Sequence, residues 1–184
     1  MKIVICDIDG VLNYYPDTIL EFAVTKGYEK QDTLKQLKET VSYADYKNLK
    51  DEYRKSSYKH DAKVRKDAKK LLKYFKDNNY FVVLLTARDC NENMIIKTCE
   101  WLRKNNLYFD YIYFSAKKDL QIYQRFPSTD IIIDDSVHNL EVIHKIKPDS
   151  KYYLIDGPDN SLYKEPKYIK RIYELQEIIE EENK

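Results

Sequence analysis

The sequence predicts an α/β fold in which a parallel sheet carries helices on both faces. Five short apolar runs, rich in β-branched and aromatic residues, alternate along the chain with stretches of helical period. Strands that are apolar throughout and separated by helices are typical of a buried parallel sheet, for which we expect the order 3-2-1-4-5. The five predicted strands are Ile3–Cys6, Tyr80–Leu85, Tyr111–Phe114, Asp130–Ile133 and Tyr152–Ile155.

The stretches between these runs have the apolar spacing of helices. One pattern precedes Asn105 and another ends at Pro148, both of which are helix-stop signals. Residues 166–184 are predicted to form a closing helix whose acidic end is solvated. The inward-facing positions are Met94, Ile95, Thr98, Trp101 and Leu102, then Val137, Leu140, Val142, Ile143 and Ile146, then Ile169, Ile172, Leu175 and Ile179.

Residues 14–61 interrupt the alternation of strands and helices. Pro16, Thr33 and Ser42 resemble helix starts, and Gly27 resembles a helix stop, so three short helices would fit. We therefore expect a core made of residues 1–13 and 62–184, with residues 14–61 inserted as a helical cap. Tyr14 and Tyr15 would lie where the core meets the cap, most simply as packing residues.

Composition excludes several classes of protein. The 184 residues include only three glycines, which are too few and too scattered for a glycine-rich dinucleotide or P-loop motif. No apolar run is long enough to span a membrane, and no signal peptide is evident, so we expect a cytoplasmic protein. The three cysteines form no C-x-x-C pair, and Cys6 reads as core filler.

The formal net charge of +1 gives no global attraction for nucleic acid. Between Lys47 and Lys76, however, twelve Lys or Arg stand against four Asp or Glu. This excess of eight positive charges is most simply a solvated helix surface, and a track for a phosphate polymer is the alternative.

Two pairs of carboxylates mark strand ends. Asp7 and Asp9 follow the first strand, and Asp134 and Asp135 follow the fourth. A lone D-x-D is often only a turn cap, but strands 1 and 4 are neighbours in the expected order, so the two pairs would converge at one edge of the sheet. Hard oxygen ligands favour Mg²⁺.

Phosphate-binding groups follow the other two strands at this edge. The second strand ends in Thr86-Ala87-Arg88, which offers a hydroxyl, a backbone N–H and a guanidinium. After the third strand, Lys117 or Lys118 would supply an ammonium able to neutralise both carboxylates and a bound phosphate.

These four motifs together resemble those of the haloacid dehalogenase (HAD) superfamily. The resemblance implies a Rossmann-like core and an Mg²⁺-dependent phosphatase with Asp7 as nucleophile and Asp9 as general acid–base. It also implies that Asp135 binds the metal directly and Asp134 through water, that the Asp9 backbone carbonyl is a ligand, and that Lys117 is favoured over Lys118. The motifs are Asp7-Ile8-Asp9-Gly10-Val11-Leu12, Thr86 within Leu-Leu-Thr-Ala-Arg, the lysine, and Asp134-Asp135-Ser136.

Within that superfamily, the chain is similar to the 5′(3′)-deoxyribonucleotidase and nucleotidase group. The similarity rests on Thr86-Ala87-Arg88, on the stretch from Glu100 to Asp110, and on an ending with Pro158, Asn160 and Arg171. It implies that the substrate is a small phosphomonoester, a (deoxy)nucleoside monophosphate. The alternatives are a polynucleotide 3′-phosphatase and a non-catalytic nucleotide- or partner-binding module.

Overall fold

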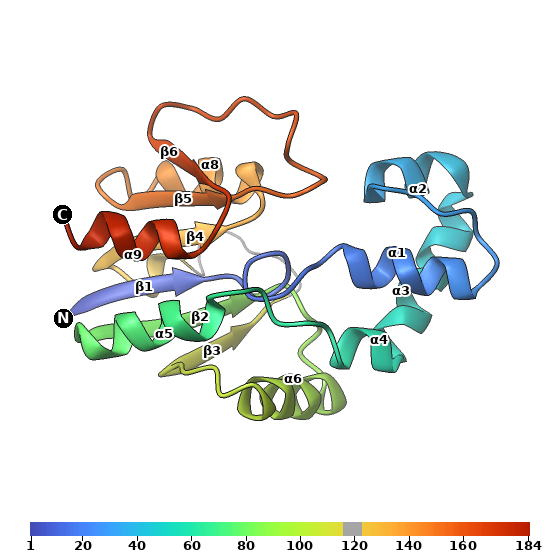
Figure 1. The fold of residues 1–184 in the computed structure, drawn as a ribbon, viewed down its shortest axis with the longest axis horizontal. Helices are drawn as coiled ribbons and strands as arrows, with labels where there is room; N and C mark the ends of the chain where they lie inside the picture. The colour runs from blue at the N-terminus through green and yellow to red at the C-terminus, as the bar shows by residue number, and fades with distance from the viewer. Residues whose placement is uncertain (116–122) are drawn as a thin grey trace.

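A six-stranded, fully parallel sheet forms the centre of the computed structural model, which describes residues 1–115 and 123–184 (Figure 1). The strand order is β3-β2-β1-β4-β5-β6. The order 3-2-1-4-5 and the α/β class are therefore confirmed. The strands are β1 (Lys2–Cys6), β2 (Tyr80–Thr86), β3 (Tyr111–Phe114), β4 (Thr129–Asp134), β5 (Lys151–Ile155) and β6 (Ile169–Ile172).

The sixth strand corrects the prediction of one closing helix over residues 166–184. β6 pairs with the outer edge of β5, from Tyr152 opposite Ile169 to Ile155 opposite Ile172, and only Gln176–Glu182 form a helix, α9. Ile169 and Ile172 are three residues apart, a spacing that suits a helix, but both are also buried in a short strand. These residues form a strand and not a helix because they pair with the open edge of β5, and such tertiary pairing overrides the local sequence pattern.

The apolar residues of the strands divide between two faces because successive side chains point to opposite sides of a sheet. On one face, Val4 and Val82 lie in a cluster with residues of α5 (Ala68–Asp77), α6 (Glu92–Lys104) and α9. On the other, Ile5 and Val83 cluster with residues of α8 (Val137–His144). Cys6 is buried in the first cluster, as predicted.

Residues 14–61 contain four helices rather than three. They are α1 (Asp17–Thr25), α2 (Leu34–Thr40), α3 (Tyr43–Lys55) and α4 (Ser57–His60). They share an apolar cluster separate from both sheet clusters and lie beyond the carboxyl end of β1 (Figure 1). Thr33 caps α2 with a full capping box, and Ser42 caps α3. No helix in the described ranges has the length and apolarity that crossing a membrane requires.

Candidate active site

Three carboxylates meet at the carboxyl ends of β1 and β4. These strands pair in parallel, so Asp7, directly after β1, lies beside Asp134, the last residue of β4. The backbone N–H of Asp7 donates to the Ile133 carbonyl at 3.0 Å. Asp7, Asp134 and Asp135 each offer an oxygen within 4.8 Å of the others, and Asp7 and Asp134 are buried. The convergence of the two acid pairs at one edge is thus present for these three residues.

Neighbouring groups hold Asp134 in a fixed orientation. Its Oδ1 accepts from the Ser136 backbone N–H at 2.9 Å, and the Asn139 side-chain amide donates to both of its oxygens at 3.1 and 3.2 Å. The three acid oxygens are spread over little more than the diameter of an octahedral Mg²⁺ shell, which is about 4 Å. An all-carboxylate oxygen set at this spacing fits Mg²⁺ better than a softer metal.

Gly10 allows Asp135 to approach the first motif. Its φ is +86°, and a Cβ at this position would lie 2.0 Å from Asp135 Oδ2. Both the left-handed backbone and the lack of a side chain are therefore required here.

Asp9 is not a member of this three-acid group, and its side chain accepts four hydrogen bonds. Its Oδ1 accepts from Arg88 Nη2 at 2.8 Å and from the Asn13 amide at 2.9 Å. Its Oδ2 accepts from Arg88 Nε at 3.0 Å and from Lys59 Nζ at 2.6 Å. Burial by itself would raise the pKa of Asp9, but the charges of Arg88 and Lys59 and the hydrogen bonds from Arg88 and Asn13 hold that pKa well below its usual range.

Arg88 lies on Asp9, in a position fixed by the core. The residue is 4% exposed, its Nη1 donates to the Thr98 hydroxyl at 3.0 Å, and its guanidinium lies 5.7 Å from the centre of the Trp101 ring. Its backbone N–H donates to Thr86 Oγ1 at 3.3 Å. The structure therefore places Arg88 as a bidentate partner of Asp9.

The remaining phosphate-binding candidates divide into two groups. Thr86 is fully buried at the end of β2, and Ala87 is exposed and lines the cavity described below. Lys117 and Lys118 lie outside the described residues.

A cavity of about 290 Å³ lies between these motifs and the helices of residues 14–61. Its core side includes Asp7, Asp9 and Asp135, and its opposite side carries cations and aromatic rings. Burial, with the charges of Arg54 and Lys38, lowers the pKa of Lys50. Burial also raises the pKa of Tyr15 well above its usual value. The lining from residues 14–61 is Tyr15, Ile19, Lys50, Tyr53, Arg54 and Lys59.

Asn13 and Lys59 are among the residues of this site that were missed in the sequence. Asn13 is buried, and its Oδ1 accepts from the backbone N–H groups of Gly10 and Tyr15, both at 3.1 Å, while its amide holds Asp9. Lys59 is 6% exposed. The position of Asn13, four residues after Asp9, was a usable signal, whereas Lys59 has no feature that separates it from the other lysines around it.

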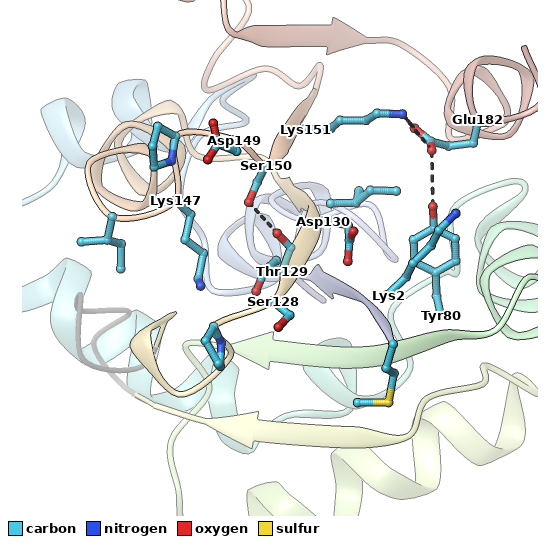
Figure 2. A pocket seen from close by; sticks show the side chains of 15 residues that line it. Lys2, Tyr80, Ser128, Thr129, Asp130, Lys147, Asp149, Ser150, Lys151 and Glu182 are labelled. Atoms are coloured by element: carbon cyan, nitrogen blue, oxygen red, sulfur yellow. Dashed lines mark hydrogen bonds and ion pairs between the residues drawn. The ribbon is translucent and has the colours of Figure 1, made fainter.

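A second cavity, of about 590 Å³, lies at the opposite, amino-terminal edge of the sheet (Figure 2). Glu182 in its wall accepts hydrogen bonds from Lys151 Nζ, at 2.8 and 3.0 Å, and from the Tyr80 hydroxyl at 3.4 Å. Asp130 accepts from the Ile3 backbone N–H at 2.7 Å. None of the predicted site residues that the structure describes lines this cavity, so the candidate active site is the one at the carboxyl edge.

Comparison with known proteins supports this architecture. No family model and no curated protein matches the sequence. A predicted phosphatase from Clostridium acetobutylicum is 19% identical, with a TM-score of 0.70, over 99% of this chain and 98% of that one. D,D-heptose 1,7-bisphosphate phosphatase from Burkholderia thailandensis is 14% identical, with a TM-score of 0.60, over 100% and 99%.

A HAD-superfamily hydrolase from Ehrlichia chaffeensis is 17% identical, with a TM-score of 0.56, over 97% of this chain and 95% of that one. At such identities the likeness is one of fold. It extends over the whole chain, including the four helices after β1. The chain therefore has the Rossmann-like α/β fold of the HAD-superfamily phosphatases and hydrolases.

Proposed function

We propose that the protein is an Mg²⁺-dependent phosphomonoester hydrolase that works through an aspartyl-phosphate on Asp7. The observation that carries this proposal is the placement of Asp7, buried at the end of β1, beside Asp134 and Asp135, with Asp9 two residues later on a separate set of cations. One carboxylate is thus placed with a candidate metal site, and the other is held apart from it.

Each step has a residue of this chain to perform it. A carboxylate oxygen of Asp7 forms the new bond to phosphorus while the bond to the substrate oxygen breaks. Asp9, which its low pKa leaves ionised in the resting protein, takes up a proton from solvent and then gives that proton to the substrate oxygen. Asp9 then takes a proton from the water that attacks phosphorus and releases Asp7 and inorganic phosphate. Asp7, Asp135, Asp134 and the Asp9 carbonyl would hold Mg²⁺, whose charge offsets the repulsion between carboxylate and phosphate.

A small substrate suits the size and lining of the cavity. Its volume of about 290 Å³ leaves room for a phosphomonoester of modest size, and the partly buried Tyr15 offers aromatic surface to a base. We therefore propose a (deoxy)nucleoside monophosphate. One of the structures similar in fold is a heptose bisphosphate phosphatase, so sugar phosphates belong in the same panel.

The basic stretch does not favour the polynucleotide alternative. Lys50, Arg54 and Lys59 line the cavity, but the stretch then continues into α5, which runs back along the sheet away from the carboxyl edge (Figure 1). Its positive charges are therefore divided between two places, whereas a nucleic-acid track requires them along one path.

Phosphate release from a panel of substrates tests the proposal. Purified protein with Mg²⁺ is assayed on deoxynucleoside monophosphates, sugar phosphates and a 3′-phosphorylated oligonucleotide. We expect turnover of a mononucleotide, and a drop of about 10³-fold or more in Asp7→Asn, because the nucleophile is lost.

Asp149→Asn serves as the matched control, since Asp149 lines only the cavity at the opposite edge and should keep full activity. Activity confined to the oligonucleotide, with a steep loss in salt, would favour the polynucleotide alternative. Failure on every substrate would favour a binding module. Turnover that survives Asp7→Asn would contradict the assignment of the nucleophile.

A further inference from the structure

The carboxylate of Asp9 has every acceptor position filled. An ionised carboxylate offers about four such positions, two on each oxygen. Arg88 and Asn13 occupy Oδ1, and Arg88 and Lys59 occupy Oδ2. If Asp9 exchanges protons with a substrate oxygen and then with water, as the proposed function requires, one of these donors has to leave.

Two of the three donor residues are fixed by other contacts. Arg88 donates hydrogen bonds to both oxygens of Asp9, and its Nη1 donates a further one to the Thr98 hydroxyl. Asn13 accepts two backbone N–H groups through its Oδ1, which fixes the direction of its amide. Neither can let go of Asp9 without breaking further hydrogen bonds.

Lys59 has fewer hydrogen bonds to hold it in place than Arg88 and Asn13 have. Among the described residues its ammonium makes one hydrogen bond, to Asp9 Oδ2, and its side chain has four rotatable bonds. It also comes from α4, in the helices beyond the sheet edge, and not from the core as Arg88 does. Lys59 is therefore the donor whose departure frees an oxygen of Asp9 at the lowest cost.

The surroundings of Lys59 offer it a second partner. Its Nζ lies 5.3 Å from the centre of the Tyr15 ring and 5.7 Å from that of Tyr53, and the same cavity contains Asp7. A phosphate group in line with Asp7 would bring its negative charge into this space. A lysine ammonium, with three donors, is suited to holding such a group.

We propose that Lys59 is a substrate-binding residue that rests on Asp9 in this structure and transfers to the phosphate when substrate binds. This proposal rests on the proposed function for the position of the phosphate. It adds that substrate itself uncovers Asp9 Oδ2, so that the general acid–base is available only when there is a phosphate to act on.

Titration of inorganic phosphate in the presence of Mg²⁺, followed by calorimetry, tests the transfer without turnover. We expect Lys59→Met to weaken phosphate binding about tenfold or more, because a charge-assisted hydrogen bond is lost, and Lys59→Arg to restore part of it. Lys55→Met removes the same charge from an exposed position at the end of α3 and should bind as wild type does.

A double-variant cycle separates transfer from simple electrostatics. Asp9→Asn releases Lys59, so phosphate should bind at least about fivefold tighter, and the double variant Asp9→Asn with Lys59→Met should lose this gain. A gain that persists in the double variant would mean that only the charge of Asp9 matters, and it would overturn the proposal.

A crystal structure of the wild-type protein with Mg²⁺ and phosphate gives an answer that does not depend on whether the Asp9 variant folds. The expected result is Lys59 Nζ on a phosphate oxygen. Lys59 still on Asp9 beside a bound phosphate, or unchanged phosphate affinity in Lys59→Met, would contradict the transfer and leave the proposed hydrolase intact. Absence of turnover would contradict the hydrolase, while the binding experiments would still decide the role of Lys59.

Discussion

Gly10 shows how closely single residues are fitted at the acid cluster. Its backbone is left-handed, and a Cβ would collide with Asp135 Oδ2. Gly27 has nearly the same φ, +87°, but nothing lies within 4 Å of its missing Cβ. A substitution at Gly27 would therefore cause backbone strain alone, whereas one at Gly10 would cause both backbone strain and a clash with Asp135.

We expect Gly27→Ala to lower the free energy of unfolding by roughly 1–2 kcal/mol, the cost of a left-handed alanine. Gly10→Ala should cost more and should also weaken Mg²⁺ binding, because Asp135 must move. Urea unfolding and calorimetric Mg²⁺ titration of both variants measure these effects. Equal stability losses and an unchanged Mg²⁺ affinity in Gly10→Ala would show that Asp135 adjusts freely.

At this scale the sequence reveals residues whose type is unusual for their place. Acidic residues are unusual at the ends of apolar strands, so the proximity of Asp7, Asp134 and Asp135 could be predicted from the sequence. The partners of Asp9 could not, since Arg88 and Lys59 come from distant parts of the chain and meet only through packing. Lys59 in particular is one of twelve basic residues between Lys47 and Lys76.

Among the elements, β6 links the edge of the sheet to the acid cluster. Arg171 in β6 donates to Asp156, to Glu165 and to the Tyr163 carbonyl. It also donates to the side-chain oxygen and to the backbone carbonyl of Asn160. The Asn160 amide in turn donates to the Asp135 carbonyl at 2.7 Å. The loop after β5 thus supports the backbone of a candidate metal ligand.

Replacement of Arg171 by Met should loosen this loop. Asp156 and Glu165 would lose their cation, and we expect a stability loss of about 3 kcal/mol, within the range for breaking a largely buried pair. Hydrogen exchange should speed up across residues 157–165, with weaker Mg²⁺ binding. Lys170→Met is the control, because Lys170 is exposed on the same strand and pairs only with Glu181 in the described residues. Equal exchange in the two variants would refute this role for Arg171.

The elements were predicted where their residues have one favourable environment. Runs such as Tyr80–Thr86 are buried on both faces and have no alternative to a central strand. Ile169 and Ile172 could be buried in a helix or in a strand, and only the unpaired edge of β5 distinguishes the two. Four helices instead of three arise because Ser56 separates α3 from the single turn of α4.

In the molecule as a whole, folding brings the three carboxylates of the acid cluster together from separate parts of the chain. In the native state Asp7, Asp134 and Asp135 lie within reach of one cation, an arrangement that the unfolded chain lacks. A cation that binds the native state alone stabilises it by mass action, about 2.7 kcal/mol at a hundredfold excess over Kd. We expect Mg²⁺ to raise the melting temperature of the wild-type protein.

Asp134→Asn should reduce that Mg²⁺-induced shift, and Asp149→Asn, at the far edge, should leave it unchanged. Differential scanning fluorimetry with and without Mg²⁺ measures both. An equal shift in all three proteins would place the stabilising cation elsewhere. The insertion of residues 14–61 as a cap after the first strand was predicted from the sequence. The packing of its helices on one another was not, because it depends on an apolar cluster whose members have no sequence signal.

Trp101, the single tryptophan of the chain, gives the site an optical signal of its own. Its indole N–H donates to the Ala62 carbonyl at 2.8 Å, where the chain returns from α4 to the core, and its ring lies against the Arg88 guanidinium. Intrinsic fluorescence excited where tyrosine does not absorb therefore comes from one buried indole, one contact away from Asp9. We expect ligand binding that shifts Arg88 or the helices to change that emission, which can be followed in real time with no label attached.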